Sequence, residues 1–242
     1  MKASGLKKML LIIEGNIGAG KSTFLKILKK HLDLDIIHEP TNKWQNISED
    51  GNILDLFYKD TRRWAYTFQS FAFVTRVQSI QDALKKNTKD LQVLERSVYC
   101  DRFCFAKNCY ESGTMSALEW QIYKNWFSWL VQGYTKRPDA FVYLKADPEV
   151  CYLRMKKRSR KEEDEVTLSY LKNLHKKHED WLIDKKETIG YIKNVPILTL
   201  DCNSDFENNK DKQEKHVKAV MDFINEIKGK YIIPAKQKQI QL

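Results

Sequence analysis

Apolar and polar positions alternate along the chain in a regular order. Short, mainly apolar segments that resemble strands occupy residues 9–13, 34–37, 91–94, 140–144 and 197–200, and segments with helical periodicity separate them. Segments of four or five residues are too short to span a membrane and predict buried strands instead. Strands that alternate with helices indicate a parallel sheet covered on both faces, so the pattern predicts an α/β domain.

Two of the predicted helices begin with recognisable signals. Asp147 precedes Pro148, which suits an N-cap followed by proline at the first helical position, and Ser116 begins a capping box. Aromatic and apolar residues then recur at helical spacing, namely Trp120, Tyr123, Trp126, Phe127 and Leu130. We interpret this stripe as core or as a helix-packed dimer face rather than as a cofactor site.

The length of the chain suits one domain. Its 242 residues contain no internal repeat and no low-complexity linker, so residues 1–242 form a single predicted domain with its core at about 9–228. The polar and basic tail, about 229–242, is expected to fray. Residues 1–8 leave no room for a signal or transit peptide before the first strand.

Charge and cysteine content limit the possible partners and the cellular compartment of the protein. The net charge of +10 suits either nucleic acid or a polyanionic small ligand, but no helix-turn-helix, zinc finger or RNP pattern is visible. We therefore expect neither a nucleic acid nor a membrane as partner. The five cysteines show no C-x-x-C spacing, which favours reduced thiols in the cytoplasm or the nucleus.

A phosphate-binding motif follows the first predicted strand. It matches G-x-x-x-x-G-K-[ST] and consists of Gly15, Asn16, Ile17, Gly18, Ala19, Gly20, Lys21 and Ser22. The glycines allow backbone N–H groups to point at phosphate oxygens, and the next helix adds its positive N-terminus. Lys21 can reach the β- and γ-phosphates, and the Ser22 hydroxyl can hold Mg²⁺. The motif predicts binding of a nucleoside triphosphate.

Charged residues end the second and third predicted strands, at the edge where parallel sheets bind ligands. Glu39 can accept a proton from an attacking hydroxyl, although a surface or helix-capping carboxylate is the ordinary alternative. Glu95 can support Mg²⁺, and Arg96 can stabilise charge on a transferred phosphoryl group. A strand-end salt bridge would explain the same pair.

A basic stretch later in the chain suggests a lid. Arg154 and Arg158 share a helical period, and Arg160 and Glu163 follow in a loop. Arginines on a mobile segment can close over a triphosphate. A solvated, charged helix end remains the alternative.

Three polar or small residues share one face of a long predicted helix. Gln69, Ala72 and Arg76 are spaced three and four residues apart, and Phe68 borders their face. An amide and a guanidinium suit hydrogen bonds to a flat heterocycle on which Phe68 can stack. Asp101 can hold Arg76 in a bidentate pair.

Together these residues resemble the deoxynucleoside kinases, and especially the deoxycytidine and deoxyguanosine kinase branch. The resemblance extends from about residue 10 to about residue 227. It rests on residues 14–23, Glu39-Pro40, Arg63-Trp64, Thr67-Phe68-Gln69, residues 95–102 and Thr199-Leu200-Asp201. It implies a P-loop fold with a parallel five-stranded sheet flanked by helices, usually as a homodimer. It also implies ATP or another nucleoside triphosphate as donor, with Mg²⁺, and a deoxynucleoside as acceptor.

The resemblance also implies roles for individual residues. Glu39 would be the general base on the 5′-hydroxyl with Arg96 beside it, while Ser22 and Glu95 would serve Mg²⁺. The nucleoside would contact Trp44, Leu54, Tyr58, Phe68, Gln69, Ala72, Arg76, Asp101, Phe105 and Glu163. The donor would contact the phosphate motif with Thr23, the lid residues Arg154, Arg158 and Arg160, and the later residues Asp201, Asp205 and Phe206.

Several positions bear on the preferred base. The pair Arg76 and Asp101 resembles the branch that accepts deoxycytidine and purine deoxynucleosides. Ala72 resembles deoxycytidine kinases, whereas residues 105–108 and 111–113 look more like deoxyguanosine kinases. Gly18 stands where deoxycytidine kinases often have alanine, a departure that does not threaten phosphate binding.

Other classes of P-loop protein fit less well. A GTPase would need N-K-x-D, but Asn42-Lys43 has no aspartate at the required place. A nucleoside monophosphate kinase would use arginines for the phosphate of its acceptor, where Glu39 suits a neutral hydroxyl. A P-loop protein that binds nucleic acid is the alternative from another class, and it predicts salt-sensitive DNA binding.

Overall fold

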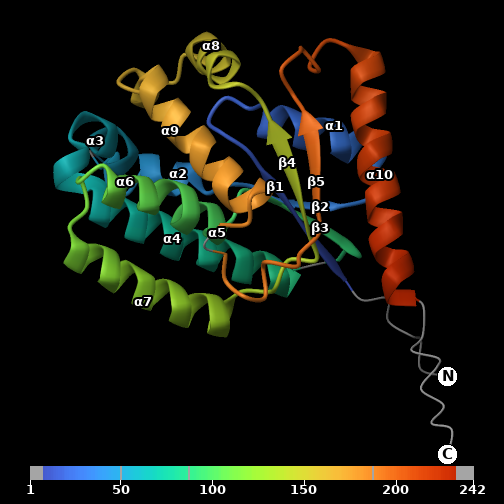
Figure 1. The fold of residues 1–242 in the computed structure, drawn as a ribbon, viewed down its shortest axis with the longest axis horizontal. Coiled ribbons are helices and arrows are strands. Elements are labelled where there is room, and N and C mark those ends of the chain that lie inside the picture. The colour runs from blue at the N-terminus through green and yellow to red at the C-terminus, as the bar shows by residue number, and fades with distance from the viewer. Residues whose placement is uncertain (1–7, 50, 87, 187, 233–242) are drawn as a thin grey trace, which may run out of the picture.

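Five parallel strands form one sheet in the order β2-β3-β1-β4-β5 (Figure 1). The computed structural model describes residues 8–232 apart from 50, 87 and 187. The strands are β1 (Met9–Glu14), β2 (Asp35–Ile37), β3 (Leu91–Glu95), β4 (Ala140–Lys145) and β5 (Ile197–Asp201). The predicted α/β class, the number of strands and their parallel pairing are confirmed, and the bounds differ by one residue at one end of each strand.

Helices connect the strands. The first half contains α1 (Lys21–His31), α2 (Thr41–Gln45), α3 (Ile53–Lys59), α4 (Thr61–Lys86), α5 (Val98–Cys100), the π-helical turn η1 (Asp101–Ala106) and α6 (Lys107–Glu111). The second half contains α7 (Ala117–Tyr134), α8 (Pro148–Arg158), the 3₁₀ turn η2 (Lys161–Glu163), α9 (Leu168–His178), the π-helical turn η3 (Glu179–Ile183) and α10 (Lys210–Ile232).

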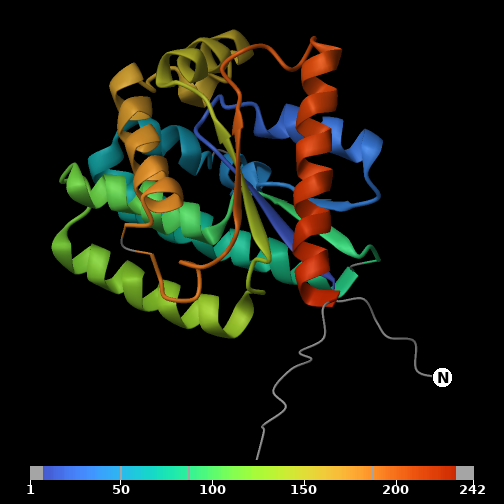
Figure 2. The same ribbon diagram turned by 45° about the vertical axis from the view of Figure 1, so that its right-hand side comes forward.

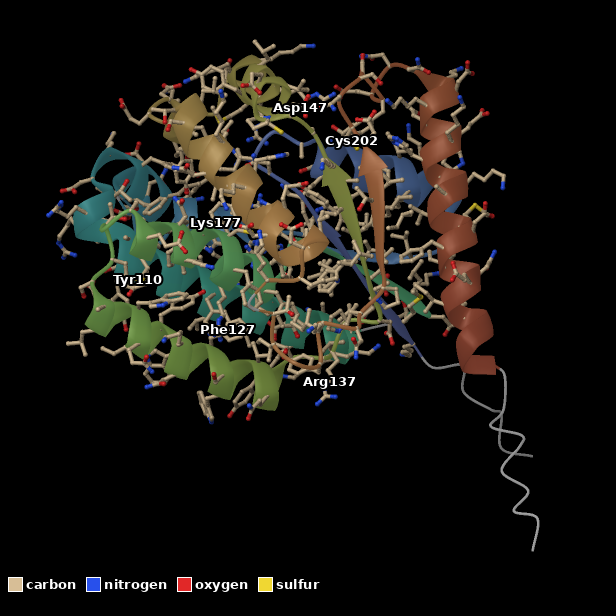
Figure 3. All side chains as sticks on the ribbon, in the orientation of Figure 1. Tyr110, Phe127, Arg137, Asp147, Lys177 and Cys202 are labelled. Carbon is tan, nitrogen blue, oxygen red and sulfur yellow. The ribbon has the colours of Figure 1, made fainter. Side chains whose placement is uncertain are left out.

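The helices cover both faces of the sheet. Figures 1 and 2 show α1 and α10 on one face, and α4, α5, α7 and α9 on the other. Every residue of β1 and β3 is buried, as expected for parallel strands between two helical layers. All five strands run the same way, so their carboxyl ends share one edge. Figure 3 labels Asp147 and Cys202 just past the ends of β4 and β5 at that edge.

The two predicted helix starts have different outcomes. Ser116 forms the complete capping box, because its hydroxyl accepts from the Glu119 N–H and the Glu119 carboxylate accepts from the Ser116 N–H. Pro148 is the first residue of α8 after Asp147, as predicted, but the exposed Asp147 carboxylate makes no capping hydrogen bond. Its backbone N–H instead donates to the Asn203 amide oxygen at 2.7 Å, which ties the end of β4 to the segment after β5.

The aromatic stripe of α7 divides between core and surface. Tyr123 and Phe127 are fully buried and pack against Phe73 of α4, whereas Trp126 and Trp129 are about half exposed, at 50% and 55%. The helix therefore has one apolar face in the core and a second apolar face in solvent.

The ends of the chain are only partly described. Helix α10 extends to Ile232, so the folded core is slightly longer than the predicted limit at 228. The rest of the predicted frayed tail, 233–242, and residues 1–7, where no signal peptide is expected, lie outside the described residues. Within the described part of the chain, no helix is both long enough and apolar enough to cross a membrane.

Candidate active site

A cavity of about 770 Å³ lies at the carboxyl edge of the sheet. It is lined by most of the site residues predicted from the sequence, namely Ile17, Gly18, Gly20, Lys21, Ser22, Thr23, Glu39, Trp44, Leu54, Tyr58, Phe68, Gln69, Ala72, Arg76, Glu95, Arg96, Asp101, Phe105, Arg154, Arg158, Arg160, Glu163, Asp205 and Phe206. Gly15, Asn16, Ala19 and Asp201 are not among its lining residues. Asp201 ends β5 and accepts a hydrogen bond from the Asn203 N–H.

The phosphate loop between β1 and α1 depends on glycine at two positions. Gly18 and Gly20 have φ angles of +79° and +94°. A Cβ atom would lie 2.1 Å from the Cys151 carbonyl oxygen at Gly18, and 2.6 Å from the Phe206 ring at Gly20. The left-handed backbone and the lack of space both require glycine here. The loop therefore keeps a tight turn, within which the Ile17 and Ala19 N–H groups donate to Asn16.

Lys21 is buried at the floor of this loop. Its ammonium group donates to the carbonyl oxygens of Gly15 at 3.0 Å and Asn16 at 2.8 Å. Burial, together with the nearby Arg96 guanidinium, lowers the pKa of Lys21 to about 8. The side chain is thus still charged at neutral pH and is held where phosphate oxygens would approach.

Ser22 and Glu95 form an oxygen pair between α1 and β3. The Ser22 hydroxyl donates to one Glu95 carboxylate oxygen at 2.5 Å, and the His38 ring Nδ1 lies 2.9 Å from the other. A hydroxyl and one carboxylate suit Mg²⁺, which takes few protein ligands and completes its shell with water and phosphate oxygens. These residues therefore fit the expected ion, and His38 holds the carboxylate from the opposite side.

Glu39 lies between two guanidinium groups. Arg76 Nη2 donates to Glu39 Oε1 at 2.7 Å, and Arg96 Nη1 donates to the same oxygen at 2.8 Å. Burial alone would raise the pKa of Glu39, but Arg96 and Arg76 outweigh it and hold the pKa well below its usual value. The carboxylate is ionised at neutral pH and can accept a proton.

Arg96 has a strained backbone at the end of β3. Its φ angle is +63°, which is uncommon for a residue with a side chain. Its N–H donates to the Ile13 carbonyl at 2.9 Å, and its guanidinium lies 4.7 Å from the centre of the Phe105 ring. This conformation turns the side chain toward Glu39, and strain of this kind is frequent at functional sites.

Helix α4 supplies one wall of the cavity. Arg76 forms the expected bidentate pair with Asp101, with Nε and Nη2 at 2.7 and 3.0 Å from its two oxygens. The Gln69 side chain is buried, and its amide nitrogen has no hydrogen-bond partner among the described residues. A buried donor without a partner costs free energy, so this amide is suited to a polar ligand.

Aromatic rings border the same wall. Phe68 packs edge-on against Trp44 at 5.6 Å and stacks on Phe57 at 4.7 Å, so its ring is held in place. The Trp44 indole N–H donates to the Thr75 hydroxyl at 2.9 Å, which fixes α2 against α4. A flat, apolar surface thus lies beside the amide of Gln69.

The predicted lid residues form two groups of contacts. Arg158 donates to both Glu163 oxygens at 2.7 Å, and Arg160 donates to one of them at 3.3 Å. Arg154 donates instead to the backbone carbonyls of residues 202–204, which lie after β5. Arg158 and Arg160 are therefore held by Glu163. Arg154 is held by the segment that precedes Phe206.

Some residues at the site were not predicted from the sequence. The cavity is also lined by Lys26, Thr41, Lys157, Glu207 and Asn208. Lys26 follows Ser22 by one helical turn, and Lys157 belongs to the basic lid stretch, so spacing could have indicated both. The role of His38 carries no such signal, because its partner Glu95 is far away in the sequence.

Comparisons with known proteins agree with this geometry. The sequence model of the deoxynucleoside kinase family matches residues 11–225. The chain is 43% identical to deoxycytidine kinase 2 of Gallus gallus, covering 88% of this chain and 89% of that protein. It is 39% identical to deoxycytidine kinase of Homo sapiens, covering 92% and 94%, and to mitochondrial deoxyguanosine kinase of Xenopus laevis, covering 86% and 88%.

These relatives give no support to a nucleoside monophosphate kinase or to a P-loop protein that binds nucleic acid. The match extends along nearly the whole fold, and it includes the phosphate loop and the carboxylate at the end of β2. The chain therefore belongs to the deoxynucleoside kinase family.

Proposed function

We propose that this deoxynucleoside kinase transfers the γ-phosphoryl group of ATP, or of another nucleoside triphosphate, to the 5′-hydroxyl of deoxycytidine and of purine deoxynucleosides. The main observation behind this proposal is the buried Gln69 amide nitrogen, which has no hydrogen-bond partner among the described residues. It lies beside the Arg76–Asp101 pair in the cavity. The Gln69 amide can donate and accept hydrogen bonds, and the Arg76 guanidinium can donate them. This combination matches the edge of a base that carries an amino group. The relatives named deoxycytidine kinase and deoxyguanosine kinase support the same substrates.

Glu39 is the proposed general base. Its carboxylate takes the proton of the 5′-hydroxyl as that oxygen attacks the γ-phosphorus and the bond to the leaving diphosphate breaks. Arg96 contacts Glu39 directly and can stabilise the charge that spreads over the phosphoryl oxygens. Lys21 and the loop N–H groups orient the phosphates. Ser22 and Glu95 would hold Mg²⁺, which when bound neutralises phosphate charge.

The remaining assignments concern the whole protein. Leu118, Trp126 and Trp129 expose a continuous apolar surface on α7, which supports a homodimer formed through this helix. All five cysteines are free and buried, which fits a reducing compartment such as the cytoplasm or the nucleus. The cavity suits a small molecule, so neither nucleic acid nor a membrane is proposed as a partner.

Initial rates at one ATP concentration test the substrate assignment. Deoxycytidine, deoxyadenosine, deoxyguanosine, deoxyuridine and thymidine would each be supplied to the full chain. We expect high rates with deoxycytidine and with at least one purine deoxynucleoside, and a low rate with thymidine. A preference for thymidine would overturn the base assignment, and no transfer to any of the nucleosides would overturn the proposed activity.

A further inference from the structure

Two thiols and an imidazole meet behind the phosphate loop. Cys100 of α5, Cys104 of η1 and His178 of α9 are all fully buried, and their Sγ and ring nitrogen atoms lie within 4.8 Å of one another. Cys100 Sγ lies 3.4 Å from His178 Nε2. None of the three lines the cavity described above, so the proposed phosphoryl transfer leaves this cluster unexplained.

The tautomer of His178 is set by its backbone contact. Its Nδ1 lies 2.7 Å from the Leu174 carbonyl oxygen, which can only accept a hydrogen bond. Nδ1 therefore carries a proton, and Nε2 faces the Cys100 Sγ. Histidines that bind metals are commonly oriented in this way, with the other ring nitrogen bonded to a carbonyl or a carboxylate.

Glu14 adds a carboxylate to the same region. It ends β1 and is fully buried; one oxygen accepts from the Ser97 hydroxyl at 2.5 Å, while the other has no hydrogen-bond partner among the described residues. The same Ser97 hydroxyl accepts from the Cys100 N–H at 3.3 Å, so Glu14 lies beside the turn that begins α5. A buried carboxylate oxygen without a partner needs a cation or a proton.

We propose that Cys100, Cys104 and His178 bind a Zn²⁺ ion. Thiolate and imidazole donors favour zinc over the hard cations Mg²⁺ and Ca²⁺. The ion would join the α5–η1 segment to α9, which are distant in the sequence.

The first test measures metal content. The ligand atoms are buried, so the ion would enter as the chain folds. The full chain would be produced with zinc in the medium, passed through metal-free buffer and analysed by inductively coupled plasma mass spectrometry. We expect one zinc per chain in the wild type, and loss of that zinc in both Cys100→Ser and Cys104→Ser. Cys109→Ser is the matched control, because Cys109 is equally buried but lies outside the cluster.

The second test identifies the ligands without relying on a variant that folds. Wild-type protein would be unfolded, freed of metal and refolded with Co²⁺ in place of Zn²⁺. Thiolate-to-cobalt charge-transfer bands and the intense visible bands of tetrahedral Co²⁺ are expected. A wild type that holds no zinc and shows no such bands, or a Cys104→Ser variant that keeps full metal content, would overturn the proposal. The cluster would then be only a set of thiol–imidazole hydrogen bonds.

Discussion

At the scale of single residues, the proposed chemistry depends on the position of Glu39. Its carboxylate accepts hydrogen bonds from Arg76 and Arg96 on the same oxygen, at 2.7 and 2.8 Å. Two cations beside one carboxylate favour its charged form, which is the form that accepts a proton. The same arrangement holds the carboxylate where β2 ends, at the edge of the sheet that carries the phosphate loop.

Glu39→Gln retains the shape of the side chain and removes the proton acceptor. We expect kcat to fall by about 10²–10⁴, the usual contribution of a general base, while the Kd for deoxynucleoside changes little. Steady-state rates and a fluorescence titration measure the two quantities. A variant within about threefold of the wild-type kcat would show that another group takes the proton.

The pH dependence of the wild type provides an independent check on Glu39. Its folded pKa lies below the ordinary value, so the base form persists as the pH falls through the normal carboxyl range. The acid limb of kcat/KM is therefore expected below the pKa of about 4.3 that a free glutamate has. An acid limb near neutral pH would contradict the proposed ionised state.

A further prediction for a single residue concerns Lys21. Lys21→Ala should abolish phosphoryl transfer and leave the fold intact, because the ammonium serves the ligand and is costly to bury. In the wild type, kcat/KM for ATP should fall as the pH rises through about 8, where Lys21 loses its proton. Lys30→Ala, exposed on the same helix, is the control. Circular dichroism separates lost binding from lost folding.

At the scale of elements, the 26-residue helix α4 organises the nucleoside site. It presents Phe68, Gln69, Ala72 and Arg76 to the cavity, while η1 supplies Asp101. Arg76 also reaches Glu39, so the same guanidinium joins the proposed base-recognition pair to the proposed general base. If both proposed roles are correct, one side chain connects substrate preference with catalysis.

The double variant Arg76→Met with Asp101→Ala tests this wall of the cavity. It removes charge and bulk together, so no carboxylate remains buried without a cation. The 5-methyl group of thymine would gain space beside residue 76, and the Asp101 carboxylate, which can accept from the amino group of a base, would be lost. We expect the ratio of thymidine to deoxycytidine kcat/KM to rise. An unchanged ratio would show that this pair does not set the preference.

Arg76→Met alone serves as the control for stability. It would leave Asp101, which is 3% exposed, without its bidentate partner. Removing one member of a buried ion pair typically costs about 3–5 kcal/mol. We therefore expect a lower free energy of unfolding for the single variant than for the double variant, measured by urea denaturation.

The sequence predicted the elements well because their signals are local. Gly18, Gly20 and Lys21 lie within one motif, and Gln69 and Arg76 lie on one helix face, so spacing alone relates them. Contacts between elements have no such signal. The approach of His38 to Glu95, the link from Arg76 to Glu39, and the cluster of Cys100 with His178 all depend on how distant segments pack. Motif resemblance supplied part of that information, but not the contacts themselves.

At the scale of the whole molecule, two surfaces are separated. The cavity opens at the carboxyl edge of the sheet, whereas α7 lies toward the opposite end of the fold (Figure 1). Helix α7 packs on α4 through buried residues such as Phe127, and its outer side exposes Trp126 and Trp129. This exposed apolar surface is the proposed homodimer interface.

The double variant Trp126→Glu with Trp129→Glu tests the proposed homodimer. Two carboxylates on each copy would repel each other across a symmetric interface and lose the apolar area that drives association. We expect light scattering to show a dimer for the wild type and a monomer for this variant. Leu153→Glu is the matched control, because Leu153 is an exposed apolar residue on α8, away from this face. No residue of α7 lines the cavity, so the monomer should retain its Kd for deoxycytidine. A wild type that is monomeric, or a variant that stays dimeric, would show that α7 is not the interface.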